Sequence, residues 1–115
     1  MTGENVLDVA REILSDEDSD NYRWSNATLL GYVQQAQYEV HMRRPDLFLS
    51  ATSTMTAPAA VASTSTILKL GTQHLGALAD FAAGKALRED ATDPDNAQRA
   101  AVLFQSFYAG IGVTV

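Results

Sequence analysis

Apolar residues recur at helical spacing in four separate segments of this 115-residue chain. The clearest segment covers residues 26–44, where apolar side chains three or four residues apart fall on one face of a helix. Ser25 is a favourable N-cap residue, and Trp24 before it can form a hydrophobic staple with Leu29. Pro45 disfavours the helical conformation for Arg44, so it ends the helix. The apolar face consists of Leu29, Val33, Ala36 and Val40.

Three further helices are predicted over residues 3–15, 70–89 and 94–109. The last of these begins with Asp93 as a cap and Pro94 at the first helical position. The pattern therefore predicts an all-α fold, a four-helix bundle-like single domain covering residues 1–115. The expected buried stripes are Val6, Leu7, Ala10, Ile13 and Leu14 in the first helix, Leu75, Leu78, Ala82 and Ala86 in the third, and Ala97, Ala100 or Ala101, Phe104 and Phe107 in the fourth.

Two segments fall outside the helices. Residues 50–66 are rich in Ser, Thr and Ala and carry no charge, and such a long loop is typically either functional or disordered. We interpret it as a candidate partner-contact loop, with a surface loop as the alternative; its candidate contact residues are Thr52, Thr54, Met55, Pro58 and Val61. A short extended tail, residues 111–115, follows Gly110 and could dock on a partner by strand addition or remain a frayed end. The tail consists of Ile111, Gly112, Val113, Thr114 and Val115.

The net charge of −6 is concentrated near the N-terminus. Residues 1–20 hold seven acidic residues and one basic residue, whereas acidic and basic residues balance in the rest of the chain. The acidic loop is a solvated surface, a patch for a basic partner, or a surface that keeps nearby DNA from adhering. Arg43 and Arg44 either complement the dipole of their helix or pair with the acidic loop of a neighbouring copy. The candidate subunit-interface charges are Asp16, Glu17, Asp18, Asp20, Arg43 and Arg44.

Residues that could carry catalysis or bind a cofactor are scarce. The absence of cysteine excludes disulfides and cysteine-based metal sites. Asp16, Asp18 and Asp20 imitate the start of a calcium loop, but Asn21 and Ala27 occupy the places that need glycine and glutamate. His41 and His74 are isolated histidines, and there is no phosphate-binding loop. We therefore expect no enzymatic activity, no metal and no cofactor.

Composition also bears on partners. The isoelectric point of about 4.6 and the scattered basic residues argue against sequence-specific binding of nucleic acid. No apolar run approaches the length of roughly 20 residues that spans a bilayer, so no membrane association is expected. The N-terminus lacks the features of a signal peptide.

Two groups of motifs resemble the head–tail adaptor (connector or neck) proteins of tailed bacteriophages. The first group is Arg23-Trp24-Ser25, Leu29-Leu30, Ala36-Gln37 and Arg44-Pro45-Asp46; the second is Leu78-Ala79-Asp80-Phe81, Ala86-Leu87-Arg88-Glu89-Asp90-Ala91, Asn96-Ala97-Gln98-Arg99-Ala100-Ala101, Phe107 and Gly110. Thr28 departs from the acidic residue that relatives often place three positions after the cap. The short segment 50–66 also stands where many relatives have a long β-rich insert.

This resemblance implies a structural protein of the virion neck, synthesised in the cytoplasm of the bacterial host. It would dock on the portal ring, with its C-terminal tail as the candidate portal contact, and would bind tail or other neck proteins. Neighbouring copies, twelve in well-known relatives, would form a ring that extends the DNA channel. The alternative from the residues alone is a small helical regulatory or antitoxin-like binding protein.

Overall fold

A computed structural model describes residues 1–48, 60–68, 70–90 and 94–112. The helices are α1 (Gly3–Leu14), α2 (Asn26–Arg43), α3 (Leu75–Glu89) and α4 (Asn96–Gly110), with short 3₁₀ helices η1 (Pro45–Phe48) and η2 (Thr72–His74). Among these described residues the β pairing is limited to an isolated bridge between Thr2 and Ile67. The predicted all-α fold is confirmed.

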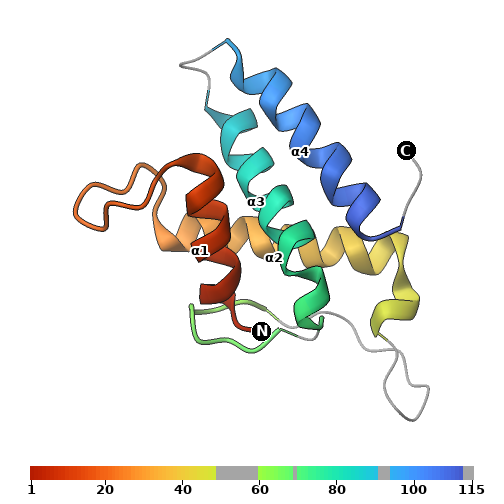
Figure 1. The fold of residues 1–115 in the computed structure, drawn as a ribbon. Helices are drawn as coiled ribbons and strands as arrows, with labels where there is room; N and C mark the ends of the chain where they lie inside the picture. The colour runs from red at the N-terminus through yellow and green to blue at the C-terminus, as the bar shows by residue number, and fades with distance from the viewer. Residues whose placement is uncertain (49–59, 69, 91–93, 113–115) are drawn as a thin grey trace.

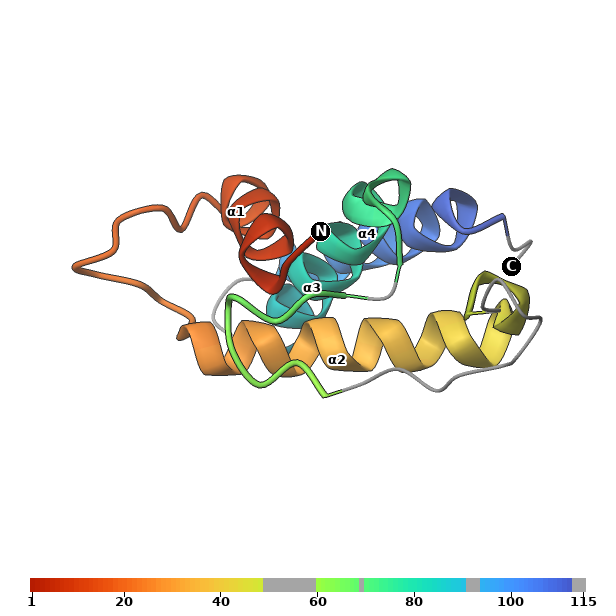
Figure 2. The ribbon, with the colours of Figure 1, turned by 90° about the horizontal axis from the view of Figure 1, so that it is seen from below.

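The helices form two layers. α1, α3 and α4 lie side by side with α3 in the middle, and α3 and α4 run antiparallel (Figure 1). α2 crosses below this layer and packs against α1 and α3 (Figure 2). The molecule is correspondingly flat, with principal extents of 46 × 32 × 18 Å.

The predicted boundaries of α2 are confirmed by its capping contacts. The Ser25 hydroxyl accepts a hydrogen bond from the backbone N–H of Thr28 at 3.2 Å. At the other end, Arg44 leaves the helical conformation immediately before Pro45. α1 also begins with a capping box, which joins Thr2 to Asn5. These local contacts satisfy backbone groups that a helix leaves unpaired at its ends.

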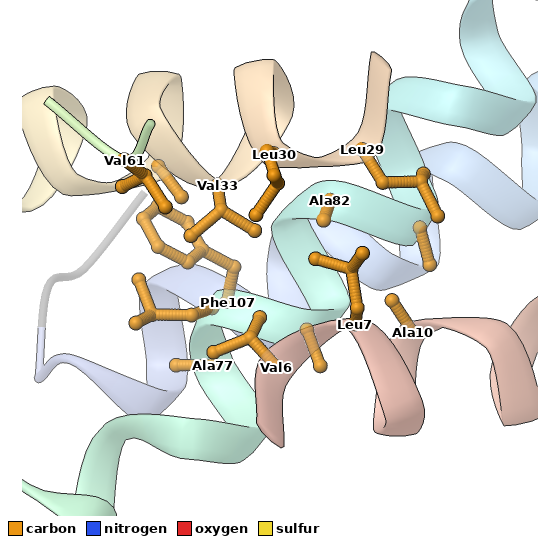
Figure 3. Close-up of a cluster of buried hydrophobic side chains, with 14 of the residues drawn as sticks. Val6, Leu7, Ala10, Leu29, Leu30, Val33, Val61, Ala77, Ala82 and Phe107 are labelled. Carbon is orange, nitrogen blue, oxygen red and sulfur yellow. The ribbon is translucent and has the colours of Figure 1, made fainter. Parts of the chain in front are cut away.

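The predicted apolar stripes form most of the core. Leu29, Val33, Ala36 and Val40 of α2 are all completely buried. Val6, Leu7 and Ala10 of α1 meet them across the interior, together with Ala82 of α3 (Figure 3). Phe107 of α4 is the largest fully buried side chain, and its ring contacts Phe81 of α3 in an edge-on arrangement.

The start of α4 differs from the prediction. The helix begins at Asn96 rather than at residue 94, and Pro94 lies in a turn, so Pro94 does not occupy the first helical position. Asn96 is buried whereas Ala97 is exposed. Asn96 is buried because its side-chain amide donates hydrogen bonds to the backbone carbonyl and to a carboxylate oxygen of Asp90, each at 3.2 Å. The predicted cap, Asp93, lies outside the described residues.

The small residues of α3 allow close packing at one point in particular. A Cβ atom added to Gly84 would lie 3.3 Å from the Leu103 Cβ of α4. Gly76 has no neighbouring atom within 4 Å of such a position. The approach of α4 to α3 therefore explains Gly84 but not Gly76.

Candidate interaction surfaces

The acidic loop between α1 and α2 is fastened at its base by a buried ion pair. Arg11 and Asp16 are 4% and 7% exposed, and their side chains form a salt bridge of 2.7 Å. The same guanidinium donates to the carbonyl of Trp24 at 2.9 Å and to the side chain of Asn26 at 2.7 Å. Asp16 also accepts hydrogen bonds from the backbone N–H groups of Arg23 and Trp24. These contacts hold the start and the end of the loop together.

The remaining acidic residues of the loop point to solvent. Glu17, Asp18 and Asp20 are exposed, and the loop extends away from the helices at one end of the molecule (Figure 1). Tyr22, which is 37% exposed, places its ring 3.4 Å from the Arg11 guanidinium. Asp16, one of the predicted interface charges, is therefore not available at the surface, because it is buried and paired with Arg11.

Arg43 and Arg44 both have partners within their own chain. Arg43 donates to Glu39 at 3.1 Å, and its guanidinium lies over the Tyr108 ring. Arg44 forms two hydrogen bonds with the Asp46 carboxylate, at 3.0 and 2.9 Å. These hydrogen bonds raise the pKa of Arg44 and lower the pKa of Asp46. The predicted contact of these arginines with a neighbouring copy stays a prediction.

The C-terminal segment is anchored where it leaves α4. Ile111 is only 2% exposed, and its carbonyl accepts a hydrogen bond from the Arg44 guanidinium. Gly112 adopts a left-handed conformation with φ of 78°. The first residue of the predicted docking tail is therefore part of the core. Val113, Thr114 and Val115 lie outside the described residues.

Part of the predicted partner-contact loop is docked on the domain. Val61 is buried, and its backbone N–H donates to the Gln34 side chain at 2.7 Å. Nearby, the backbone N–H groups of Gly3 and Glu4 donate to the carbonyls of Thr66 and Thr64. A Cβ on Gly3 would lie 3.0 Å from Leu30, so only glycine fits this approach without a shift. The other contact candidates, Thr52, Thr54, Met55 and Pro58, lie outside the described residues.

A groove that the sequence did not predict lies between α2, α3 and α4. Its volume is about 470 Å³, and two cations and one carboxylate line it. Arg88 is exposed and lies over the Phe104 ring at 5.0 Å, whereas Lys85 makes an ion pair with Glu89 at 3.6 Å. The lining residues are Gln35, Glu39, Phe81, Lys85, Arg88, Phe104 and Tyr108. The sequence could have indicated this groove, because the spacings of four and three residues place Phe81, Lys85 and Arg88 on one face of a helix.

Glu39 is the only carboxylate in this groove lining, and it is already engaged. It accepts a hydrogen bond from the Tyr108 hydroxyl at 2.7 Å as well as one from Arg43. Burial and the hydrogen bond with Glu39 raise the pKa of Tyr108, so this hydroxyl stays protonated at neutral pH. The groove therefore offers aromatic faces and ammonium or guanidinium groups to a ligand.

A second hollow, of about 210 Å³, lies where the acidic loop meets the turn between α3 and α4. Arg23 forms a salt bridge with Asp90, and Asn96 donates to the same carboxylate. The end of the acidic loop thus meets the end of α3 and the start of α4 at Asp90. These polar groups are used to hold the elements together.

The described residues show no arrangement typical of a metal site. No cluster of three or more His, Asp or Glu side chains suited to a metal occurs in them. His41 packs edge-on against Phe48, and burial, assisted by Arg44, lowers the pKa of His74. The helices in this part of the chain are too short or too polar to cross a bilayer.

Comparison of the chain with protein-family models, curated proteins and solved structures finds no match.

Proposed function

We propose that this protein is a structural component of a tailed-phage virion, a head–tail adaptor that docks on the portal ring and connects the capsid to the tail. The observation that carries the proposal is the joint at Asp90. Arg23 comes from the first group of adaptor-like motifs, and Asp90 and Asn96 come from the second group. The two groups on which the resemblance depends therefore contact each other in one compact domain.

The other motif residues also have definite places in the fold. Ser25 caps α2, Gln37 is 1% exposed, and Phe107 fills the core. Asp80 and Ser106 join α3 to α4 through a hydrogen bond of 2.7 Å. Motifs that determine helix ends and helix contacts suit a protein whose task is to present surfaces, because such a protein needs a rigid body rather than catalytic groups.

The charge distribution suits a conduit for DNA. Exposed acidic residues gather on α1, namely Glu4, Asp8 and Glu12. Such a surface repels the phosphate backbone, so DNA that passes through a ring would not adhere to it. Copies of the chain would stay soluble as monomers until the portal brings them together.

Native mass spectrometry of the purified protein, alone and mixed with the portal protein of the same genome, tests this proposal. We expect a monomer alone and, with the portal, a complex that contains a symmetric multiple of the chain. A portal from an unrelated phage is the control and should bind none. A stable small oligomer that ignores its own portal would contradict the proposal and favour a regulatory or antitoxin-like role.

A further inference from the structure

We infer that the groove between α2, α3 and α4 receives the acidic loop of a second copy of this chain, residues 17–22. The inference deepens the proposed function and rests on it, since it names the surfaces through which neighbouring adaptors would touch. Arg43 and Arg44 are not the centre of this contact. Arg44 is held by Asp46 and by the carbonyl of Ile111.

Charge complementarity identifies the occupant. In a chain of net charge −6, the groove lining carries two cations, Lys85 and Arg88, against the single carboxylate of Glu39. Glu39 already binds Arg43 and Tyr108, and Lys85 pairs with Glu89, so Arg88 is the exposed cation of the lining. The loop offers the opposite charge, because Glu17, Asp18 and Asp20 are all exposed.

The apolar parts of the two surfaces also match. Phe81, Phe104 and Tyr108 line the groove, and Tyr22 is a partly exposed ring in the loop. Aromatic rings beside arginines favour edge-on and cation–π contacts with another ring. A loop with three carboxylates followed by a tyrosine therefore matches both the cations and the rings of the groove.

The geometry requires that the loop come from another molecule. The loop emerges beside α1, whereas α4 lines the groove, and α3 lies between α1 and α4 (Figure 1). A chain's own loop is thus separated from its own groove. Contact between two different surfaces is heterologous, and repetition of such a contact produces a ring or an open filament.

The size of the contact explains why free copies would not assemble. A loop of six residues covers far less than the roughly 1,000 Å² that a stable interface buries. The contact is therefore weak in free solution and becomes effective when a template raises the local concentration. The buried Arg11–Asp16 pair supports docking, because it fixes the base of the loop before the contact forms.

Disulfide trapping tests the contact directly, since the chain has no cysteine of its own. One chain carries Ser19→Cys in the loop, and a second, isotope-labelled chain carries Gln35→Cys in the groove. Both positions are exposed and uncharged, so neither change removes a charge of the contact. The matched control replaces Gln35→Cys by Gln73→Cys, which is exposed and lies outside the groove. We expect the loop–groove heterodimer to form about tenfold faster than the control, and more slowly as salt rises.

A charge swap then separates docking from random collision. Lys85→Glu with Arg88→Glu in the groove chain should slow trapping about tenfold. Glu17→Lys with Asp20→Lys in the loop chain should restore it. Unchanged urea midpoints verify that the variants fold. Two results would overturn the inference. One is an equal rate of disulfide formation at Gln35→Cys and Gln73→Cys, and the other is charge reversal in the groove that leaves this rate unchanged.

Portal binding distinguishes this inference from the proposed function. If trapping succeeds but the chain ignores its portal, the adaptor proposal fails and the loop–groove contact stands. If the groove variant joins the portal in the normal multiple, the adaptor proposal stands and the loop–groove contact is overturned. If the groove variant loses portal binding but its rate of disulfide trapping is unchanged, the groove binds the portal and the inferred docking between copies is overturned.

Discussion

Replacement of Arg11 by alanine should destabilise the protein severely. The guanidinium is 4% exposed and donates four hydrogen bonds, two to Asp16 and one each to Trp24 and Asn26. Arg11→Ala leaves the Asp16 carboxylate buried without its cation. Removal of one partner of a buried ion pair typically costs about 3–5 kcal/mol. The whole unfolding free energy of a 115-residue domain is only about 6–17 kcal/mol.

Urea denaturation followed by circular dichroism measures this loss, and a thermal melt should show a decrease in Tm of about 12–20 °C. Arg99→Ala is the matched control, because Arg99 is an exposed arginine on α4. Its effect should stay within about 0.5 kcal/mol. A double-mutant cycle with Asp16→Ala should show that the two losses are less than additive.

Equal unfolding free energies for Arg11→Ala and Arg99→Ala would contradict this prediction. Such a result would mean that the loop base opens freely and that water reaches Asp16. The loop would then not be preorganised, and the argument for docking through a rigid loop would lose its support.

Three further predictions concern packing, the C-terminal anchor and pH. Gly76→Ala should raise the unfolding free energy by about 0.5–1 kcal/mol in urea denaturation, whereas Gly84→Ala should gain less because its methyl group crowds α4. Arg44→Ala should accelerate amide hydrogen exchange at Ile111, which NMR can follow residue by residue. The lowered pKa of His74 means that the unfolded chain binds a proton first, so stability should fall as pH decreases below about 6.5 and level off below the folded pKa.

Each of these predictions has a control within the chain. Gly31→Ala should behave like Gly76→Ala, since Gly31 also has open space around it; an equal gain at Gly84 would contradict the packing argument. Arg43→Ala should leave exchange at Ile111 unchanged. His74→Gln should flatten the acid limb of the stability curve.

The limits of α2 and most of the buried stripes were predictable because their causes are local, whereas α3 begins at Leu75 rather than at residue 70 and α4 at Asn96 rather than at residue 94. Ser25 and Pro45 act within one turn of their own positions, so the limits of α2 followed from the residues at each end. The α2 stripe from Leu29 to Val40 is buried because a helix repeats every 3.6 residues whatever it packs against. Such features require no knowledge of the tertiary arrangement.

Other features depend on polar contacts that the helical pattern does not encode. Asn96 is buried because it binds Asp90 across the turn, a contact that the apolar pattern of α4 does not encode. Arg11 occupies the apolar face of α1 between Leu7 and Leu14, which was a readable sign of a buried charge, but its partner Asp16 looked like one acid among many. Ile111 is held by Arg44, 67 residues earlier in the chain.

The position of the cations shows which charge contacts the sequence could not predict. The sequence indicated an acidic loop and left two roles open for the adjacent Arg43 and Arg44, which were the dipole of their own helix and the acidic loop of a neighbouring copy. In the fold, Glu39 and Asp46 neutralise that end of α2. Lys85 and Arg88, separated in sequence by apolar residues, join aromatic residues from α4 to form a groove in which cations outnumber the carboxylate. Because Glu39 and Asp46 pair with the adjacent arginines, the proposed loop–groove contact relies on a surface that only tertiary packing creates, and a charge map of the folded chain identifies that surface.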